Sequence, residues 1–309
     1  MTITRRSEPT EGRHRPYTIG DAASDRLPGS SFAAGTRLRA HVGTGVRYIL
    51  LTVVAAMFLF PIYWAVVVSV DHRSQVFTLP PHLVPSFDLN PIRRALVVLP
   101  WAKYFLNTTI ITLATIVSVL VTGALAGYSL ALREFRGREV LFAVLLAALM
   151  VPPEATLIPD YVITARLGLL NTLAGQVAPV AANVYAIFLF RQFFKTLPPS
   201  LWEASQLDGV SWYRYLSRVA VPMARPAVVT VTLLTFASQW SAFEWPLIIT
   251  QGSRARPVEV ALSFFQGFDG THWREISGAA LITMLPILIV FSFAHKYIVK
   301  SVAGDTGDT

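Results

Sequence analysis

Two glutamates lie within or beside long apolar stretches of the sequence, Glu154 and Glu244. A carboxylate at membrane depth is costly, so it usually faces a water-filled cavity or a partner. Glu244 follows Gln239 and Trp240 in a short polar and aromatic segment. Aromatic rings can stack on the apolar faces of sugars, while amides and carboxylates can hydrogen-bond to hydroxyls. We therefore interpret these four residues as the lining of a solute path. The alternative is that Trp240 packs between helices and Glu244 lies at the membrane edge.

The groups that would support an enzyme are absent from the sequence. There is no cysteine, which excludes thiolate metal sites and cysteine nucleophiles. No glycine is followed by lysine, so there is no phosphate-binding P-loop. The six histidines are scattered, and neither a His-Glu-x-x-His nor a Gly-x-Ser-x-Gly motif occurs. We expect no catalytic residue, no metal site and no cofactor in this chain.

Apolar helices are the elements that must position the candidate residues. The chain is 53% hydrophobic and 14% charged, with a mean hydropathy of +0.52, whereas soluble domains carry about 25% charged residues. Several apolar runs approach the roughly 20 residues that a membrane-spanning helix needs. The sequence therefore predicts an all-α membrane protein with six spans. They cover about residues 46–70, 105–130, 140 onward, 173–194, 226–250 and 277–299.

Prolines separate and interrupt the early spans. Segment 71–104 carries five prolines, so we expect an ordered external loop there rather than a further span. Pro152-Pro153 interrupts the far end of the third span, where freed backbone must be satisfied by protein or water. We expect this end, with Glu154, to line the interior and shape an outer gate. Asn107 and Asn183 are expected to form interhelical hydrogen bonds.

The chain ends are polar and the whole chain is basic. Residues 1–44 have no apolar period and predict a disordered basic tail, followed by a six-helix membrane domain at 45–300 and a short tail at 301–309. The net charge is +8. Cytoplasmic loops of membrane proteins accumulate Lys and Arg, so this charge does not point to nucleic acid. Most of the 26 basic residues fall on the side that carries both termini and the block 195–225, which predicts that this side is cytoplasmic.

The block 195–225 is polar and aromatic-rich, and its first half predicts a short helix. Ser200 and Glu203 have the spacing of a capping box, in which each side chain satisfies a free amide at the helix start. The helix is expected from about Pro199 to Leu207. Asp208-Gly209 should stop it, because glycine readily adopts a left-handed turn.

The second half of the block predicts another short helix, over about 212–219. Ser211 can cap it, Pro222 is expected to end it, and Pro226 suits the first turn of the fifth span. Aromatic side chains beside a few charges are typical of a protein-binding surface. An amphipathic helix lying in lipid head groups has the same composition, so the residue types alone leave both interpretations open.

The residues from Glu203 to Val210, Glu-Ala-Ser-Gln-Leu-Asp-Gly-Val, followed by Pro222 and Pro226, resemble the "EAA" loop of bacterial ABC importer membrane subunits. Ser205 and Val210 depart from the usual alanines. Other segments resemble the carbohydrate-uptake subfamily, in the half related to the second permease subunit of maltose and glycerol-3-phosphate systems. These segments are Leu106–Thr108, Gly127–Ala131, Phe135–Arg138, Val151–Glu154, Gly168–Thr172, Phe188–Phe194 and Trp240–Leu247. The usual C-terminal glycine-rich ending is replaced by Lys300-Ser-Val-Ala-Gly304.

The resemblance implies a coupling helix that sits in a cleft of a separate ATPase subunit. Glu203 would pair with a basic residue of the ATPase, and Gly209 would allow the turn. The resemblance also implies a second six-helix permease, two ATPase copies that bind ATP and Mg²⁺, an extracytoplasmic sugar-binding protein, and a bacterial inner membrane with both termini cytoplasmic. The implied coupling residues are Glu203, Ala204, Ser205, Asp208, Gly209 and Trp212.

Other functions remain open at this point. An ABC permease for another solute, such as an amino acid or polyamine, is one alternative. An ion-coupled secondary transporter is another, but it needs no partner ATPase and does not explain the geometry expected at 200–226. The sequence does not name the sugar: glycerol-3-phosphate, disaccharides and oligosaccharides all fit.

Overall fold

The computed structural model describes residues 32–71, 83–267 and 270–303. The chain divides into two compact units, Met1–Phe58 and Leu59–Thr309. The first helix, α1, runs from Phe32 to Ser69. Residues 32–44, predicted to be disordered, are therefore helical. They contain three alanines and two arginines, which favour a helix, and no proline to stop one. The rest of the predicted tail, 1–31, and residues 304–309 lie outside the described residues.

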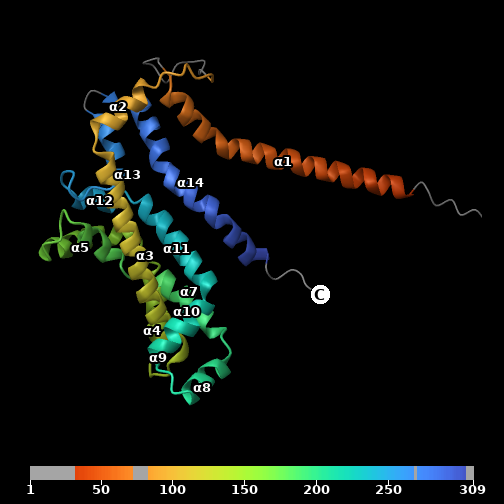
Figure 1. Ribbon diagram of the computed structural model, residues 1–309, viewed down its shortest axis with the longest axis vertical. Helices are drawn as coiled ribbons and strands as arrows, with labels where there is room; N and C mark the ends of the chain where they lie inside the picture. The colour runs from red at the N-terminus through yellow and green to blue at the C-terminus, as the bar shows by residue number, and fades with distance from the viewer. Residues whose placement is uncertain (1–31, 72–82, 268–269, 304–309) are drawn as a thin grey trace, which may run out of the picture. The chain divides into compact units, whose positions relative to one another are not determined.

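The second unit is built from helices, with one minimal hairpin (Figure 1). The expectation of an all-α protein is thus confirmed, and the strands found in the described residues are limited to two that pair antiparallel. The elements are α2 Asn90–Val98, α3 Trp101–Leu132, α4 Arg138–Ala148, α5 Pro153–Arg166, α6 Leu173–Val177, η1 Ala178–Val180, α7 Val184–Lys195, α8 Pro199–Leu207, α9 Trp212–Tyr215, η2 Leu216–Ala220, α10 Val221–Met223, α11 Arg225–Trp240, α12 Glu244–Ile249, α13 Val258–Leu262, η3 Ser263–Phe265, β1 Gln266–Gly267, β2 Gly270–Thr271 and α14 Trp273–Ala303.

Length and composition identify the helices able to cross a membrane. Within the described residues, three single helices qualify: Gly45–Ser69, Trp101–Leu132 and Trp273–Ala294. Three bent pairs bring the number to as many as six, if each pair counts as one span. The pairs are Arg138–Ala148 with Pro153–Arg166, Leu173–Val180 with Val184–Lys195, and Trp212–Met223 with Arg225–Trp240, bent by 98°, 49° and 80°.

The bends explain where the predicted spans and the structure differ. The interruption at Pro152-Pro153 is confirmed as a break between α4 and α5. The fourth span, predicted as one helix, breaks before α7, because the Asn183 side chain accepts a hydrogen bond from the Ala186 N–H and begins a new helix. Asn183 is thus a helix cap rather than an interhelical link. The fifth span was predicted to reach about residue 250, but α11 ends at Trp240.

Helices α3 and α7 form the centre of the second unit. Gly123 and Gly127, four residues apart, bring the two backbones together, because a Cβ on Gly127 would lie 2.7 Å from the Cβ of Phe190 and 2.9 Å from the amide nitrogen of Arg191. Small residues at this spacing are typical of close helix pairs in membranes. Figure 1 shows α2 and α13 at one end of α3 and the α8–α9 segment at the other.

Candidate functional site

The α8–α9 segment has the helix–turn–helix shape that the sequence predicts. Helix α8 spans Pro199–Leu207, as expected. Gly209 has φ +68°, and two hydrogen bonds close the helix end: the Gly209 N–H donates to Gln206 O and the Val210 N–H to Ser205 O, at 3.0 and 2.9 Å. This pattern is a Schellman motif, which favours glycine at the left-handed position. The turn predicted at Asp208-Gly209 is therefore confirmed.

Two other details of the block differ from prediction. Pro198, rather than Ser200, occupies the N-cap of α8, and no side-chain cap is formed there within the described residues. The capping box is wrong because Pro199 suits the first helical position, which moves Ser200 inside the helix. Pro222 does not end the second helix, which continues to Met223. A π-helical turn at Leu216–Ala220 precedes the proline, and such turns relax the regular bonding that a proline would otherwise disrupt.

Aromatic rings pack the α8–α9 segment against α3 and α7. Tyr128, near the end of α3, is fully buried. Its ring lies 6.3 Å from those of Trp202 and Trp212, 6.4 Å from Tyr215 and 6.5 Å from Phe194. Trp202 and Tyr215 meet edge to face at 4.9 Å, in the range where aromatic pairs attract. These rings, from four elements, form what we call the Tyr128 cluster: Tyr128, Phe194, Trp202, Trp212 and Tyr215.

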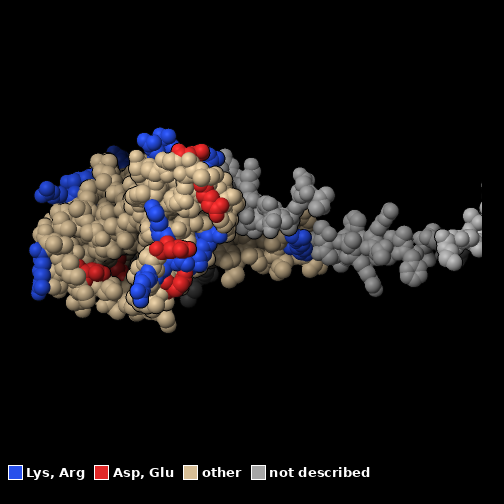
Figure 2. All heavy atoms as spheres, turned by 90° about the horizontal axis from the view of Figure 1, so that it is seen from below, with Lys and Arg blue, Asp and Glu red and all other residues tan. Residues whose placement is uncertain are grey.

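The opposite surface of the segment is exposed. Glu203, Ala204 and Asp208 are exposed, while Ser205 is buried and its hydroxyl donates to Trp202 O at 2.7 Å. Leu207 is 89% exposed. Figure 2 views this end of the unit and shows basic and acidic side chains side by side on it. The predicted coupling residues therefore lie on one segment, with Ser205 facing inward and Trp212 only partly exposed.

An ion pair beside the segment was not predicted. Arg191 of α7 is 3% exposed, and its guanidinium contacts both carboxylate oxygens of Glu139 at 2.7 and 2.8 Å. It also donates to Leu130 O at 3.2 Å and lies 3.7 Å from the centre of the Phe142 ring. Arg191 thereby ties α7 to the end of α3 and the start of α4. Sequence spacing offers no signal for this pair, since its members are far apart in the chain.

One of the predicted path residues, Gln239, lines a cavity. The cavity is small, about 60 Å³. Its other polar groups come from Thr108, Gln176 and Trp245, and the Trp245 indole donates to Gly175 O at 3.2 Å. Gln176 is buried, and its side-chain carbonyl has no hydrogen-bond partner among the described residues. Uncharged donors and acceptors of this kind suit hydroxyl groups.

The other three path residues lie apart from this cavity. Trp240 is buried, donates from its indole to Thr283 O at 3.0 Å, and stacks on Phe236. Trp240 thereby joins α11 to α14, which is the kind of contact that the packing alternative describes. Glu154 and Glu244 are exposed in the first turns of α5 and α12, where a carboxylate is favoured by the helix dipole.

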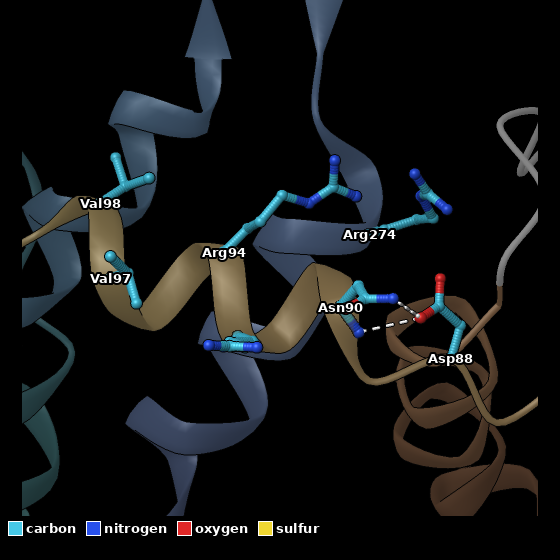
Figure 3. A pocket seen from close by; sticks show the side chains of 7 residues that line it. Asp88, Asn90, Arg94, Val97, Val98 and Arg274 are labelled. Atoms are coloured by element: carbon cyan, nitrogen blue, oxygen red, sulfur yellow. Dashed lines mark hydrogen bonds between the residues drawn. The ribbon is translucent and has the colours of Figure 1, made fainter.

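An open groove lies at the far end of α3, between α2 and the start of α14 (Figure 3). Its volume is about 660 Å³. Arg94 pairs with Glu275 at 3.2 Å, and the Arg274 guanidinium donates to Asp71 O. Asn107 was predicted to form an interhelical hydrogen bond, but its amide donates to Arg254 O and Arg256 O, which lie in the loop between α12 and α13, so it joins α3 to a loop. The groove is lined by Asp88, Asn90, Arg93, Arg94, Val97, Val98 and Arg274.

Known sequences resemble this chain over most of its length. A family model described as "Binding-protein-dependent transport system inner membrane component" matches residues 119–304. The sn-glycerol-3-phosphate transport system permease protein UgpE of Pectobacterium atrosepticum is 29% identical over 262 residues, which cover 82% of this chain and 93% of that protein. The arabinooligosaccharides transport system permease protein AraQ of Bacillus subtilis is 29% identical over 198 residues, covering 64% of this chain and 70% of that protein.

Solved structures share the fold. One chain, from a bacterial ABC transporter that imports the acidic polysaccharide alginate, matches with a TM-score of 0.73 at 24% identity, covering 83% of this chain and 96% of that chain. A second, from an alginate ABC transporter in complex with its pentasaccharide-bound periplasmic protein, has a TM-score of 0.55 at 12% identity and covers 89% of this chain and 98% of that one. The helical arrangement described above is therefore one already seen in ABC importers.

Proposed function

Because the chain belongs to the family of binding-protein-dependent transport system inner membrane components, we propose that it is one half of the pore of an ATP-driven carbohydrate importer. In this family the chain is a membrane permease rather than an enzyme, and nucleotide is bound by a separate ATPase subunit. We propose as its partners a second six-helix permease, two ATPase copies and an extracytoplasmic sugar-binding protein.

The observation that carries the coupling role is the exposed α8–α9 segment. Its outer surface presents Leu207, 89% exposed, between Glu203 and Asp208. An exposed apolar side chain flanked by charges suits a protein cleft, where it can be buried while the charges pair at the rim. Trp202 and Tyr215 point into the Tyr128 cluster instead of outward, so the segment is fixed to the helices behind it. We propose that it docks on the ATPase.

The proposed membrane orientation follows the distribution of charge. The α8–α9 end carries Arg133, Arg136, Arg138, Lys195, Arg214 and Arg218, and cytoplasmic ends of spans are enriched in such residues. We therefore propose that this end and both termini are cytoplasmic. Helix α11 has 16 residues, about 24 Å at 1.5 Å per residue. It falls short of the roughly 30 Å hydrocarbon core, and α12 would complete the crossing.

The proposed solute is a carbohydrate or sugar phosphate. The similar proteins named above serve sn-glycerol-3-phosphate, arabinooligosaccharides and alginate. In this chain, the uncharged cavity beside Gln239 offers amide and hydroxyl groups, and the exposed Glu154 and Glu244 are available to a pore shared with the second permease. We propose that Gln239, Glu154 and Glu244 contribute to the path, and that Trp240 supports it by packing.

The experiment is ATP-driven uptake by the importer reconstituted in proteoliposomes, using wild type, Glu203→Gln and Gln206→Glu. sn-Glycerol-3-phosphate and arabinotriose serve as labelled probes. We expect uptake to require ATP and the ATPase subunit, and Glu203→Gln to lower both uptake and ATP hydrolysis, because the charge that faces the ATPase is lost. Gln206→Glu is the control for a charge change at a neighbouring exposed position. Uptake driven by this chain alone with an ion gradient would refute the proposed function.

A further inference from the structure

An arginine at the end of α3, Arg133, lies against the docking segment but is not one of the predicted coupling residues. Arg133 follows the last residue of α3, and its guanidinium lies 5.6 Å from the Trp202 ring centre and 5.9 Å from that of Tyr128. We propose that Arg133 is a positioning residue, which clamps α8 onto α3 so that the α8–α9 segment and the α3–α7 pair move as one body. This inference rests on the proposed function, since it concerns how the docking segment transmits motion.

The α3–α7 pair behaves as the stiff part of such a body. The backbones meet at Gly123 and Gly127, where added Cβ atoms would lie 3.1 Å from the Ala186 Cβ and 2.7 Å from the Phe190 Cβ. Contacts this close leave no room for the helices to slide without separating. The buried Arg191 adds a polar tie to Leu130 O of α3. A displacement of α7 is therefore passed to α3 directly.

The α8–α9 segment has two attachments to this pair. The first is covalent: α7 ends at Lys195 and α8 begins at Pro199, so a short turn joins them. The second is the Tyr128 cluster, which holds Trp202 of α8 and Tyr215 of α9 against α3. At its other end the segment continues through η2 and α10 into α11, which packs in the same buried core as α3 and α7. Between these two ends, the aromatic contact fixes the angle of α8 relative to α3.

Arg133 lies over the contact between the Tyr128 and Trp202 rings. Its guanidinium is within the roughly 6 Å at which a cation is attracted to an aromatic face, and it reaches rings of both α3 and α8. Its own backbone is held in place, because Arg138 donates to Arg133 O at 3.2 Å. Arg138 in turn pairs with Glu139, the partner of Arg191. The clamp is thus connected through the 133–138 turn to α7.

Arginine suits this position better than lysine. A planar guanidinium can lie against two rings at once and is weakly hydrated, whereas an ammonium is a compact, strongly hydrated charge. We expect loss of the cation to reduce the ratio of docked to undocked α8 by about tenfold, taking two exposed cation–π contacts together. Arg133→Lys should retain part of the effect. Arg136, an exposed arginine of the same turn, provides the matched control.

The test is a distance measurement in the assembled importer. The chain has no cysteine, so Val121→Cys on α3 and Gln206→Cys on α8 accept two spin labels at exposed positions that the proposed docking contacts do not use. Partner subunits are made cysteine-free. Pulsed dipolar spectroscopy is recorded without nucleotide and with ATP plus vanadate. We expect one narrow distance that ATP leaves unchanged, and a second, undocked population in Arg133→Gln that is absent in Arg136→Gln.

Trp202→Leu completes a double-mutant cycle with Arg133→Gln. Both variants remove the contact between the Arg133 guanidinium and the Trp202 ring, and each also removes contacts of its own, so their effects on the undocked population should be less than additive in the double variant. A distance that changes on ATP binding in wild type would overturn the rigid-body inference, as would identical traces for Arg133→Gln and Arg136→Gln. Failure of the proposed function looks different: the ATPase subunit would then not copurify with this chain at all.

Discussion

Replacing Gly127 by alanine tests the close contact between α3 and α7. The added Cβ would lie 2.7 Å from the Phe190 Cβ, 2.9 Å from the Arg191 amide nitrogen and 3.2 Å from Ile187 O. Carbon atoms pack best at about 3.5–4.0 Å, so α7 must move away by about 1 Å. The atoms in the way are backbone atoms and a Cβ, which cannot rotate aside.

The expected cost combines two opposing effects. Overpacking of this kind costs about 1–3 kcal/mol, and replacing glycine by alanine within a helix returns about 0.5–1 kcal/mol. We therefore expect Gly127→Ala to destabilise the protein by about 1–2 kcal/mol. Gly123→Ala meets softer contacts, 3.1 Å from the Ala186 Cβ and 3.2 Å from a Phe190 ring carbon, so the two effects should nearly cancel.

The assay is thermal unfolding of the purified permease in detergent, followed by tryptophan fluorescence. One kcal/mol shifts the melting temperature of a domain of this size by roughly 2–4 °C, so Gly127→Ala should melt roughly 4 °C lower than wild type. Gly45→Ala is the control, because nothing lies within 4 Å of its added Cβ. Gly127→Ala melting at or above the temperature of Gly123→Ala would refute the reasoning.

Three further predictions concern single contacts. Gly209→Ala should lower the free energy of unfolding by about 1 kcal/mol, because Gly209 has φ +68°, and Gly209→Asn should lower it less. Equal unfolding midpoints for the two variants would contradict the left-handed turn. Glu139→Gln should lower the free energy of unfolding more than Arg191→Met does, because it leaves the charge of Arg191, whose side chain is 4% exposed, without its partner, whereas Arg191→Met leaves only a 61% exposed carboxylate. Chemical denaturation of the two variants compares them, and a smaller loss for Glu139→Gln would count against the pair. Trp240→Phe should lower the free energy of unfolding by about 1 kcal/mol, because the hydrogen bond to Thr283 O is lost. Uptake per folded complex should stay at the wild-type level, and a selective loss of uptake would show that Trp240 lines the solute path.

Local signals predicted the parts of the site that depend on neighbouring residues. The bounds of α8 follow from Pro199 at its start and Gly209 after its end, and both act within one turn of helix. The break at Pro152-Pro153 is local in the same sense. The predicted capping box failed through competition between two local signals, since Pro199 at the first helical position leaves Ser200 inside the helix.

Tertiary contacts account for what the sequence left open. Trp240 is buried because α14 supplies Thr283 O as its acceptor, and no pattern around Trp240 reveals that partner. In the sequence, Arg191 is indistinguishable from other basic residues near span ends, and only the fold places Glu139 beside it. Tyr128 is surrounded by rings from three later elements. In each case the deciding residue lies tens of positions away along the chain.

The most direct test of the proposed coupling role is crosslinking from Leu207. A photoactivatable probe on Leu207→Cys, the sole cysteine of the chain, is irradiated in the assembled importer with and without ATP. We predict crosslinks to the ATPase subunit whose yield changes with nucleotide, and none from Val97→Cys at the other end of the unit. An active importer in which Leu207→Cys gives no ATPase crosslink, or in which Val97→Cys gives as many, would contradict the account.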